Sequence, residues 1–462
     1  MQFKKIYFIG IGGIGMSAIA RFFLHNGTEI HGYDKTETEL TKQLVAEGMH
    51  IHYTDDVHYI PEGIEFVVYT PAVPQDHAEL NYFRVNGFEI MKRSEVLGII
   101  SREKFCLAVA GTHGKTTTTC LLTHLLFEGG LDPSAFLGGV SLSLGSNFVQ
   151  GSSDYVVVEA DEYDRSFLRL SPNIAVINSL DPDHLDIYGD EENFKQGFID
   201  FTKKVKPGGL ILVKKGLDFG FPNSQNLQFD SEVRNPKSEI HWKTFGIGEG
   251  DFNATDVRVE NGVFVFNLKS PLGDIKNIKT ALPGRHNIEN AVAGIAVAQT
   301  LGVNAEKIVE AMSNFKGIRR RFETLYKDVE RQRIYIDDYA HHPAELKAAI
   351  NAARELYPEN KLIGIFQPHL FTRTRDFKDG FIAALNQLDE LVLLDIYPAR
   401  EKPIIGITSE IIFEGITIPK MLVSKKIFEL QLSDWLKKLP ENKYTLMTLG
   451  AGDIDELRRL II

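Results

Sequence analysis

Short apolar runs alternate with helical patterns in the first part of the chain. Residues 4–10 (KKIYFIG) and 29–34 (EIHGYD) predict strands, and residues 16–27 (MSAIARFFLHNG) between them predict a helix that ends at Gly27. Residues 65–74 (EFVVYTPAVP) predict a further strand that stops at two prolines. This alternation is typical of a parallel sheet covered by helices. We therefore predict an α/β domain over residues 1–97.

The pattern continues in two further units. From 98 to 317, strands are predicted at 104–111, 154–161 and 173–180, followed by an Ala-rich helix at 287–302. Residues 211–280 are richer in polar residues, and we interpret them as an antiparallel elaboration with a hairpin strand at 262–268. From 318 to 462, strands are predicted at 333–339, 361–368, 390–398 and 443–453, with a helix at 342–357. This third unit has the pattern of a second doubly wound sheet.

Composition narrows the class of protein. A chain of 462 residues is too long for one ordinary core, and its length suggests about three domains. A net charge of −11 argues against a general nucleic-acid surface. No stretch has the roughly 18 apolar residues of a membrane span. Cys106 and Cys120 form no scaffold or metal pattern, so we expect buried thiols in a soluble, cytoplasmic protein.

One glycine-rich turn has the chemistry of a nucleotide phosphate loop. The apolar strand 105–110 is followed by Gly111-Thr112-His113-Gly114-Lys115-Thr116-Thr117, which leads into a helix. Backbone N–H groups of such a loop converge on phosphate oxygens, and the helix N-terminus adds its positive end. Lys115 would reach the outer phosphates, and the Thr116 hydroxyl would contact Mg²⁺. Val109 stands where the motif usually has its first glycine, but the order of strand, loop and helix favours ATP binding over an ordinary turn.

Two strand ends offer ligands for Mg²⁺. Glu159 ends a buried strand, where a carboxylate is costly unless it has a function. Asp183, His184 and Asp186 follow the next strand. Both ends should lie at the carboxyl edge where the phosphate loop lies. We interpret Glu159 as a metal ligand, whereas for His184 the residue types alone leave the role open, because Mg²⁺ prefers oxygen.

A second glycine loop lies near the N-terminus. Gly10, Gly12 and Gly15 have the spacing G-x-G-x-x-G, Gly13 lies between them, and Asp34 ends the second strand. This is the dinucleotide fingerprint, in which the acidic residue contacts a ribose hydroxyl. Because the loop offers only backbone N–H groups, any nucleotide diphosphate would fit. The sequence predicts a diphosphate site and leaves NAD and other diphosphates open.

Polar residues also end the strands of the third unit. The carboxyl ends carry Asp337 and Asp338, then His341 and His342, Gln367 and His369, and Asp395. By the crevice rule this edge should face a ligand. Arg373 and Arg375 are natural partners of a carboxylate or phosphate. Residues 319–321, three arginines at the junction, are either solvated linker charge or a phosphate contact.

Together these stretches resemble the Mur ligase family along the whole chain, and within it the alanine-adding branch. The resemblance rests on GIGGIGMS, GTHGKTTT, VVEADEYDRSF, DPDHLDIYG, GRHNIENAVA, RRRFE, DDYAHHPAE, FQPHLFTRTRDF, YPAREKPI and LGAGDI in this order. It implies a Rossmann-like domain for a UDP-sugar (1–97), a central P-loop ATPase-type domain (98–317) and a C-terminal Rossmann-like domain for an amino acid (318–462). It also implies ATP-dependent ligation of L-alanine to UDP-N-acetylmuramate through an acyl phosphate, in peptidoglycan precursor synthesis.

The resemblance assigns roles to particular residues. Glu159 and His184, with Thr116, would hold the metal, and Lys115 would act with them in catalysis. The ATP site would include the phosphate loop 111–117 together with His286, Asn287, Asn290, Arg321 and Asp338. The UDP-sugar would contact Gly10, Gly12, Gly13, Gly15, Asp34 and Thr70. The amino acid would contact His342, His369 and Arg373.

Two departures from the family pattern bear on these roles. Leu370 stands where the alanine-adding branch commonly has an arginine, so a clamp of two arginines would lose one arm unless Arg375 or another group replaces it. Phe198 stands where several sister ligases carry a carbamoylated lysine. The second departure fits the alanine-adding branch, and Lys195 is a poor substitute.

Three other functions remain to be distinguished. One is a murein-recycling ligase that joins a tripeptide to the same UDP-sugar. Another is an NAD-dependent oxidoreductase with an accessory ATPase, and the third is a member that only binds nucleotide. In the ligase hypotheses, separate ligands must be brought together, so we expect domain closure about hinges near residues 97 and 317.

Overall fold

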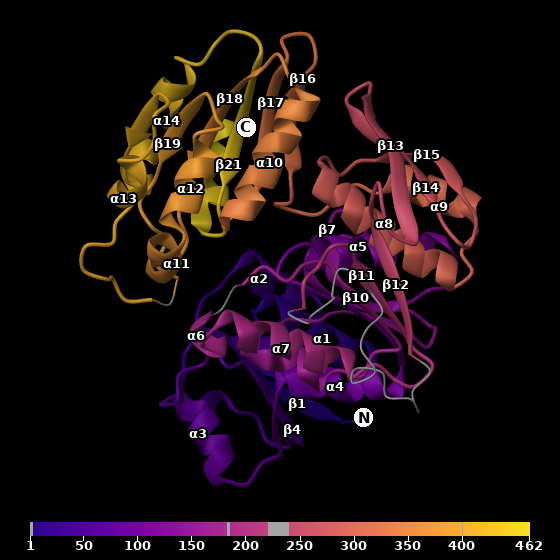
Figure 1. Ribbon diagram of the computed structural model, residues 1–462. Helices are drawn as coiled ribbons and strands as arrows, with labels where there is room; N and C mark the ends of the chain where they lie inside the picture. The colour runs from indigo at the N-terminus through magenta and orange to yellow at the C-terminus, as the bar shows by residue number, and fades with distance from the viewer. Residues whose placement is uncertain (1–2, 183–184, 220–239, 400) are drawn as a thin grey trace. The chain divides into compact units, whose positions relative to one another are not determined.

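Three β-sheets organise the chain in the computed structural model, which describes residues 3–182, 185–219, 240–399 and 401–462 (Figure 1). The chain divides into two compact units. The first comprises Met1–Thr255, Leu268–Ile275 and Glu289–Phe315, and the second comprises Asp256–Asn267, Lys276–Ile288 and Lys316–Ile462. One unit boundary lies beside the junction predicted near residue 317. The three-domain α/β class is confirmed, whereas the boundaries at 97 and 317 stay predictions.

The N-terminal sheet has five strands that all pair in parallel. Their order is β3 (His50–His52), β2 (Glu29–Tyr33), β1 (Lys5–Ile9), β4 (Phe66–Tyr69), β5 (Ile90–Lys92). Its helices are α1 (Ile14–His25), α2 (Glu39–Ala46), α3 (Ala78–Val85) and α4 (Arg93–Glu103). Successive side chains alternate between the faces, so Phe8 packs with α1 and α4 whereas Tyr7 packs with α3. The predicted parallel sheet is confirmed.

The central sheet has ten strands. Their order is β15 (Ile275–Thr280), β14 (Val263–Lys269), β13 (Phe252–Glu260), β12 (His241–Ile247), β11 (Leu210–Lys214), β10 (Ile174–Ile177), β6 (Phe105–Ala110), β9 (Tyr155–Glu159), β7 (Ser134–Ser141), β8 (Ser146–Val149). Its helices are α5 (Lys115–Glu128), α6 (Leu185–Tyr188), α7 (Glu191–Thr202), α8 (Arg285–Thr300) and α9 (Ala305–Asn314). Strands β10, β6 and β9 are parallel, so the loops that follow these three strands begin at the same edge of the sheet, its carboxyl edge.

The antiparallel elaboration occupies less of the sheet than its predicted range. Strands β11 and β12 pair in parallel, and so do β12 and β13. The antiparallel part begins at the turn Asn261-Gly262 between β13 and β14, where both residues have positive φ (52° and 76°). Two such residues are typical of a tight hairpin turn. The predicted hairpin strand at 262–268 is confirmed as β14.

Buried contacts join the first two sheets within the first unit. One apolar cluster runs from Phe8 and Phe23 to Ala108 and Val158. Helix α1 also packs on the β7–β8 hairpin through polar groups: Arg21 donates to the Asn147 amide oxygen, and the Asn147 amide donates to Ser17 Oγ at 2.9 Å. The core is therefore continuous past residue 97. A hinge there stays a hypothesis.

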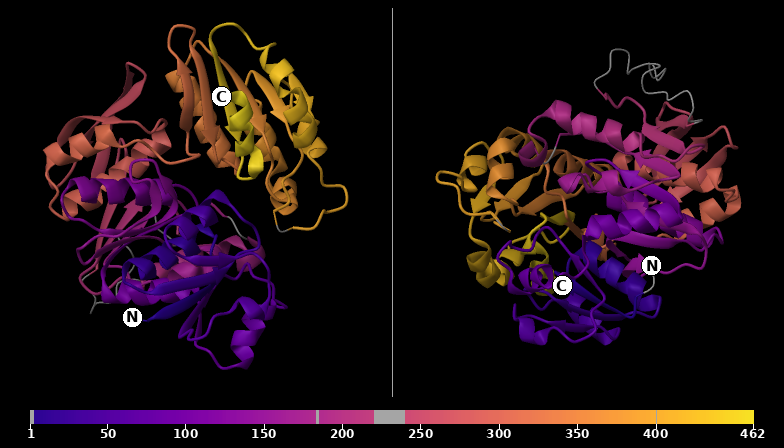
Figure 2. Two further views of the ribbon diagram at one scale, coloured as in Figure 1. Left: turned by 180° about the vertical axis from the view of Figure 1, so that it is seen from behind. Right: turned by 90° about the horizontal axis from the view of Figure 1, so that it is seen from below.

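The C-terminal sheet is parallel except for its first strand. The order is β16 (Glu323–Asp328), β17 (Arg333–Asp338), β21 (Tyr444–Leu449), β18 (Lys361–Phe366), β19 (Glu390–Leu393), β20 (Lys420–Leu422). Helices α10 (Pro343–Leu356) and α12 (Lys378–Leu385) cover one face, and α14 (Lys425–Leu436) covers the other (Figure 1 and Figure 2). The shorter helices are α11 (Phe371–Asp376), α13 (Glu410–Phe413) and α15 (Arg458–Ile461), and short 3₁₀ turns lie at Val57–Tyr59, Tyr163–Arg169 and Asp453–Leu457. The second doubly wound unit is confirmed.

Within the residues that the structure describes, no helix is long and apolar enough to cross a membrane. Cys106 and Cys120 are both buried, as predicted, and form no disulfide, and burial raises the pKa of the Cys106 thiol to about 12.

Candidate active site

The loop between β6 and α5 has the backbone of a phosphate loop. Gly111 has φ +131° and Gly114 has φ +79°, and Gly114 is the residue before the first turn of α5. A Cβ at Gly111 would lie 2.8 Å from the Ser179 backbone nitrogen, so no other residue fits without displacing a neighbouring strand. Thr116 and Thr117 are buried in the first turn of α5. The N–H groups of that turn have no acceptor within the helix, which makes this end a site for anions.

Lys115 lies against a carboxylate that the sequence did not single out. Its Nζ is 2.8 and 2.7 Å from the two carboxylate oxygens of Glu162, and 2.8 Å from the Gly111 carbonyl oxygen. Burial raises the pKa of Glu162 to about 7, although Lys115 opposes the rise. Burial would lower the pKa of Lys115, but the nearby carboxylates, Glu162 first, outweigh it and hold that pKa above its ordinary value. The pair is therefore a strong, buried contact at the phosphate loop.

Glu159 occupies the end of β9, beside β6 in the sheet. Val109 and Glu159 are register partners across these strands, so the carboxylate lies at the edge from which the phosphate loop leaves. On its other side, the Glu159 carboxylate lies directly against Gly138 of β7, where a Cβ would overlap it. The missing side chain at Gly138 makes the space in which the carboxylate lies.

The loop after β10 reaches the phosphate loop, as the sequence predicted. Thr112 Oγ1 donates to the Asp181 carbonyl oxygen at 2.5 Å, and the His113 N–H donates to Ser179 Oγ at 2.7 Å. The His113 ring lies 3.6 Å from the Asp181 carboxylate. Asp183 and His184 lie outside the described residues, so the role predicted for His184 stays a prediction.

Helix α8 brings one of its predicted ATP contacts to this edge. Thr118 Oγ1 donates to Asn290 Oδ1 at 3.2 Å, and a Cβ at Gly114 would overlap the same oxygen. Asn290 therefore lies directly beside the phosphate loop. His286 and Asn287 lie in the first turn of α8, where the Asn287 amide donates to the Pro283 carbonyl oxygen at 2.7 Å.

Residues predicted for the diphosphate site lie close together at the N-terminal glycine loop. The Gly12 N–H donates to Asp34 Oδ2 at 2.7 Å, and the side chain of Thr70 lies against Gly10. A Cβ at Gly15 would lie 2.6 Å from Arg93 Nη1, so this guanidinium stands at the N-terminal turn of α1. A cation at a helix N-terminus is unfavourable alone and favourable when an anion lies between them. Arg93, which also lies 3.6 Å from the Asp161 carboxylate, is a candidate site residue that sequence analysis missed.

In the second unit, Asp338 and Arg321 lie close together. Asp338 accepts hydrogen bonds from the N–H groups of Phe322 and Ala340, both at 2.7 Å. Burial raises the pKa of Asp338 to about 6, and Arg321 is the main group that opposes the rise. Of the three junction arginines, Arg320 is held by the carbonyl oxygens of Gly450 (2.6 Å) and Gly452 (3.1 Å). Arg320 is thus a structural residue, and Arg319 is exposed.

The residues predicted for the amino acid also lie in the second unit. Arg373 is buried, with Nη1 3.3 Å from His369 Nδ1. The His369 ring stacks on Tyr397 at 5.7 Å between centroids. His342 precedes α10 and accepts from the Ala344 N–H at 3.3 Å. His369 and Arg373 are brought together, as the carboxylate-binding hypothesis requires.

Comparison with known proteins places the chain in one family. Family models match three consecutive stretches: the Mur ligase family catalytic domain at residues 5–105, the Mur ligase middle domain at 109–298 and the Mur ligase glutamate ligase domain at 320–437. The chain belongs to the Mur ligase family.

Individual relatives agree over nearly the full length. The UDP-N-acetylmuramate–L-alanine ligase of Christiangramia forsetii is 46% identical over 461 residues, covering 98% of this chain and 96% of the relative. The ligase of the same name from Phocaeicola vulgatus is 46% identical over 460 residues, with the same coverage. Among solved structures, the UDP-N-acetylmuramate-alanine ligase of Thermotoga maritima has a TM-score of 0.80 at 29% identity, covering 99% of this chain and 98% of that one.

The two departures of this Mur ligase have clear structural settings. Phe198 is fully buried in α7, edge-on to Phe167 at 5.2 Å, so the place of the carbamoylated lysine is an apolar core position. Lys195 pairs with Glu191 at 3.0 Å, which raises its pKa. Carbamoylation requires a neutral amine, whereas this ion pair favours the charged one; that Lys195 is a poor substitute stays a prediction.

Leu370 has an unusual backbone in this Mur ligase. Its φ is +70° at the residue before α11, a region that is costly for a leucine. Arg375, which could replace the arginine missing at position 370, forms an exposed ion pair with Asp376 at 2.7 Å. Arg373 contacts His369, so His369 is a better candidate than Arg375 for the second group of the clamp.

Proposed function

We propose that this chain joins L-alanine to the lactyl carboxylate of UDP-N-acetylmuramate with the free energy of ATP. The proposal rests on the presence of two glycine loops of the nucleotide-binding type in one chain, one around Asp34 and one around Lys115. The chain is also 46% identical, over nearly its full length, to a UDP-N-acetylmuramate–L-alanine ligase. The first loop would hold the diphosphate of the sugar, and the second would hold ATP.

The phosphate loop would neutralise charge as two anions approach. Lys115 and the first turn of α5 would contact the outer phosphates, while Asn290 would lie beside them. Thr116 and Glu159, with His184, would hold Mg²⁺, and the space beside Gly138 fits a carboxylate directed to that edge. When bound, the ion would withdraw charge from the phosphate oxygens.

The reaction would proceed in two steps. An oxygen of the lactyl carboxylate attacks the γ-phosphorus, the bond to the bridging oxygen breaks, and ADP leaves with that electron pair. The resulting acyl phosphate has the leaving group that a free carboxylate lacks. The amine of L-alanine then attacks the carbonyl carbon, a proton leaves the nitrogen, and phosphate departs from the tetrahedral intermediate. The protein would act mainly by positioning these groups.

Arg373 and His369 would receive the carboxylate of L-alanine. A guanidinium is the natural bidentate partner of a carboxylate, and its burial strengthens the contact. All substrates would be small molecules, and nucleotide substrates point to the cytoplasm as the place of action.

Phosphate release tests the proposal directly. Purified chain, UDP-N-acetylmuramate, ATP and Mg²⁺ are mixed with L-alanine, glycine, L-serine or the stem tripeptide in separate reactions, and the product is identified by mass. Release that is greatest with L-alanine, with the alanyl product, is expected. Release only with the tripeptide would assign the chain to murein recycling. No release with any acceptor would contradict the proposal.

A further inference from the structure

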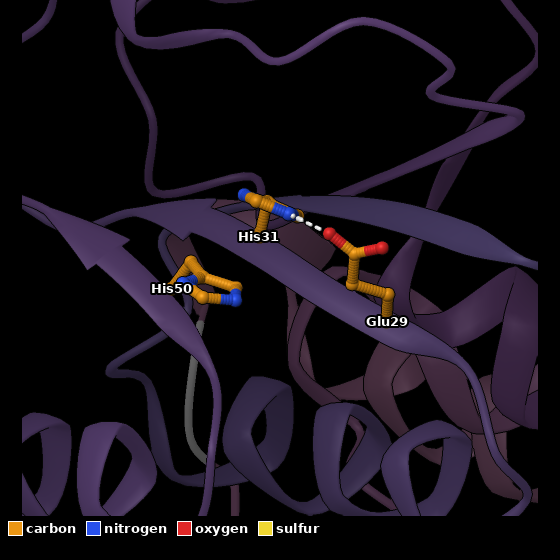
Figure 3. A group of neighbouring side chains, drawn as sticks. All are labelled: Glu29, His31 and His50. Atoms are coloured by element: carbon orange, nitrogen blue, oxygen red, sulfur yellow. Dashed lines mark hydrogen bonds and ion pairs between the residues drawn. The ribbon is translucent and has the colours of Figure 1, made fainter.

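A second group of possible metal ligands lies on the N-terminal sheet. Glu29 and His31 are two residues apart on β2, so both project from the same face. His31 is the direct register partner of His50 on the edge strand β3. One ligand atom from each of the three side chains lies within 4.8 Å of the others (Figure 3).

The two imidazoles of this group are close and parallel. The rings of His31 and His50 stack with centroids 4.6 Å apart and planes 20° apart, so the exposed His50 ring must turn for both imidazoles to direct a nitrogen at one ion. His31 Nε2 lies 2.7 Å from Glu29 Oε1, within hydrogen-bond distance (Figure 3). A neutral imidazole is the form that ligates metals.

We propose that Glu29, His31 and His50 bind one divalent transition-metal ion of the Zn²⁺ class. Binding would break the hydrogen bond between Glu29 and His31 and release its proton to solvent, and the freed imidazole nitrogen and carboxylate oxygen would ligate the ion. Two imidazoles and one carboxylate suit Zn²⁺, whereas Mg²⁺ prefers oxygen ligands throughout. Three protein ligands leave a fourth position for water.

Lys5 is the neighbouring cation, and its ammonium must move away from Glu29 when the metal ion binds. Its Nζ lies 3.2 Å from Glu29 Oε1. The Lys5 side chain is 23% exposed, so it can turn its ammonium to solvent when the ion binds. Binding would then exchange one exposed ion pair for direct ligation, and it would tie the three-residue edge strand β3 to β2.

This ion would be distinct from the Mg²⁺ of the proposed reaction. Glu29 and His50 are the first residues of their strands, whereas Asp34 follows the end of β2. Since the strands are parallel, the group lies at the amino edge of the sheet and the glycine loop at the carboxyl edge. The consequence expected of the ion is stabilisation of the N-terminal sheet, and the proposal does not depend on the ligase reaction.

Calorimetric titration of the full-length chain with ZnCl₂ tests the site, after chelator treatment and in excess Mg²⁺. Zn²⁺ binding that depends on His31 and His50 is expected. Because loss of an outer partner of a metal ligand already costs about 10- to 100-fold in affinity, His31→Gln and His50→Gln should each weaken binding at least about tenfold. The matched control is His58→Gln: His58 lies 2.6 Å from Asp56 in an exposed imidazole–carboxylate pair that is not part of the cluster. Its binding should equal that of the wild type.

Two further readouts keep the test independent of folding. Circular dichroism shows whether each variant is folded, and His50→Gln changes an exposed residue. Co²⁺ in place of Zn²⁺ should give visible absorption bands that the two cluster variants lose and the control keeps. Zn²⁺ affinity that is unchanged in both cluster variants, or equally weakened in the control, would overturn the proposal, and so would the absence of measurable binding.

Discussion

The ammonium of Lys115 and the carboxylate of Glu162 form a nearly fully buried ion pair across 47 residues of sequence, with Nζ–O distances of 2.7 and 2.8 Å. The Lys115 side chain is 13% exposed and that of Glu162 is 2% exposed. Under the proposed function, the same ammonium is the group that would contact a bound nucleotide. We therefore expect Glu162 and the phosphates of ATP to compete for Lys115.

The first prediction concerns Glu162→Gln. Removing one partner of a buried pair leaves an uncompensated charge, so the variant should lose about 3 kcal/mol of unfolding free energy without nucleotide. ATP then restores a partner to Lys115, and the rise in melting temperature with ATP should exceed that of the wild type. Thermal unfolding over a series of ATP concentrations measures this. Equal ATP-dependent rises in both proteins would show that Glu162 and ATP do not compete.

A matched control for this prediction is Asp154→Asn. Asp154 pairs with Lys104 at 3.0 Å, but its side chain is 90% exposed. Exposed pairs contribute about 0–1 kcal/mol, so this variant should show little change in stability and no change in its response to ATP.

The second prediction concerns Lys115→Met. The variant lacks the ammonium that would offset developing charge on the outer phosphates, so phosphate release should fall by about 10²–10³. The glycine loop around Asp34 belongs to another sheet, so binding of UDP-N-acetylmuramate should be within a factor of about two of the wild type. Phosphate release and equilibrium binding of the UDP-sugar are measured in parallel. Loss of both would contradict the separation of the two nucleotide sites.

What the sequence predicts well here is local. The order of strand, glycine turn and helix predicts both nucleotide loops, and the structure adds the contacts of Asp34 with Gly12 and of Asn290 with the phosphate loop. The strands of all three units are recognisable because apolar runs alternate with helical patterns.

The contacts that the sequence does not predict join residues that are far apart along the chain or lie on different elements. The segment around Glu159 holds several carboxylates, and no spacing rule distinguishes the one that reaches Lys115. Arg93 follows β5 and reaches the turn of α1 only because the sheet order brings these elements together. The parallel pairing of β12 with β13 is likewise a property of the whole sheet.

The third prediction concerns Gly138→Ala. A methyl group would overlap the Glu159 carboxylate, which must then move from the edge beside the phosphate loop. Because misplacing a positioned group by about 1 Å can cost 10²-fold, we expect turnover to fall at least about tenfold and the Mg²⁺ concentration for half-maximal rate to rise. Gly294→Ala is the control: in this helix its Cβ would lie 3.3 Å from Leu125 Cδ1, the end of a flexible side chain, and no nearer than 3.7 Å to the Leu122 backbone. Equal rates in both variants would remove Glu159 from the metal site.

The fourth prediction concerns Leu370. An arginine at this position would add a second guanidinium to the region of Arg373, and a charge-assisted hydrogen bond contributes about 1.5–3 kcal/mol. Leu370→Arg should therefore lower the KM for L-alanine about tenfold or more, with little change in kcat. Leu370→Lys is the control, because an ammonium lacks the planar fork that matches a carboxylate. A KM that is unchanged in Leu370→Arg would show that His369 already completes the clamp.

The last prediction concerns the pH dependence of stability at Glu79. This carboxyl is fully buried, accepts from Tyr7 Oη at 2.8 Å and lies 3.4 Å from His52 Nε2. Burial raises its pKa from 4.5 to about 7, and the charges of Asp55 and Asp56 add to the rise. In the unfolded chain the carboxyl ionises near its ordinary pKa. Its contribution to stability is therefore fully present below pH 4.5 and is lost as the pH rises through about 7.

A shift of this size corresponds to about 3 kcal/mol. Glu79→Gln has no carboxyl to ionise, but its amide oxygen can still accept from Tyr7. The unfolding free energy of the variant, relative to the wild type, should thus increase by about 3 kcal/mol between pH 4.5 and pH 8. Urea unfolding of both proteins across this range measures the difference. Parallel curves would mean that Glu79 is already ionised in the folded protein at low pH, and that its neighbours stabilise the charge.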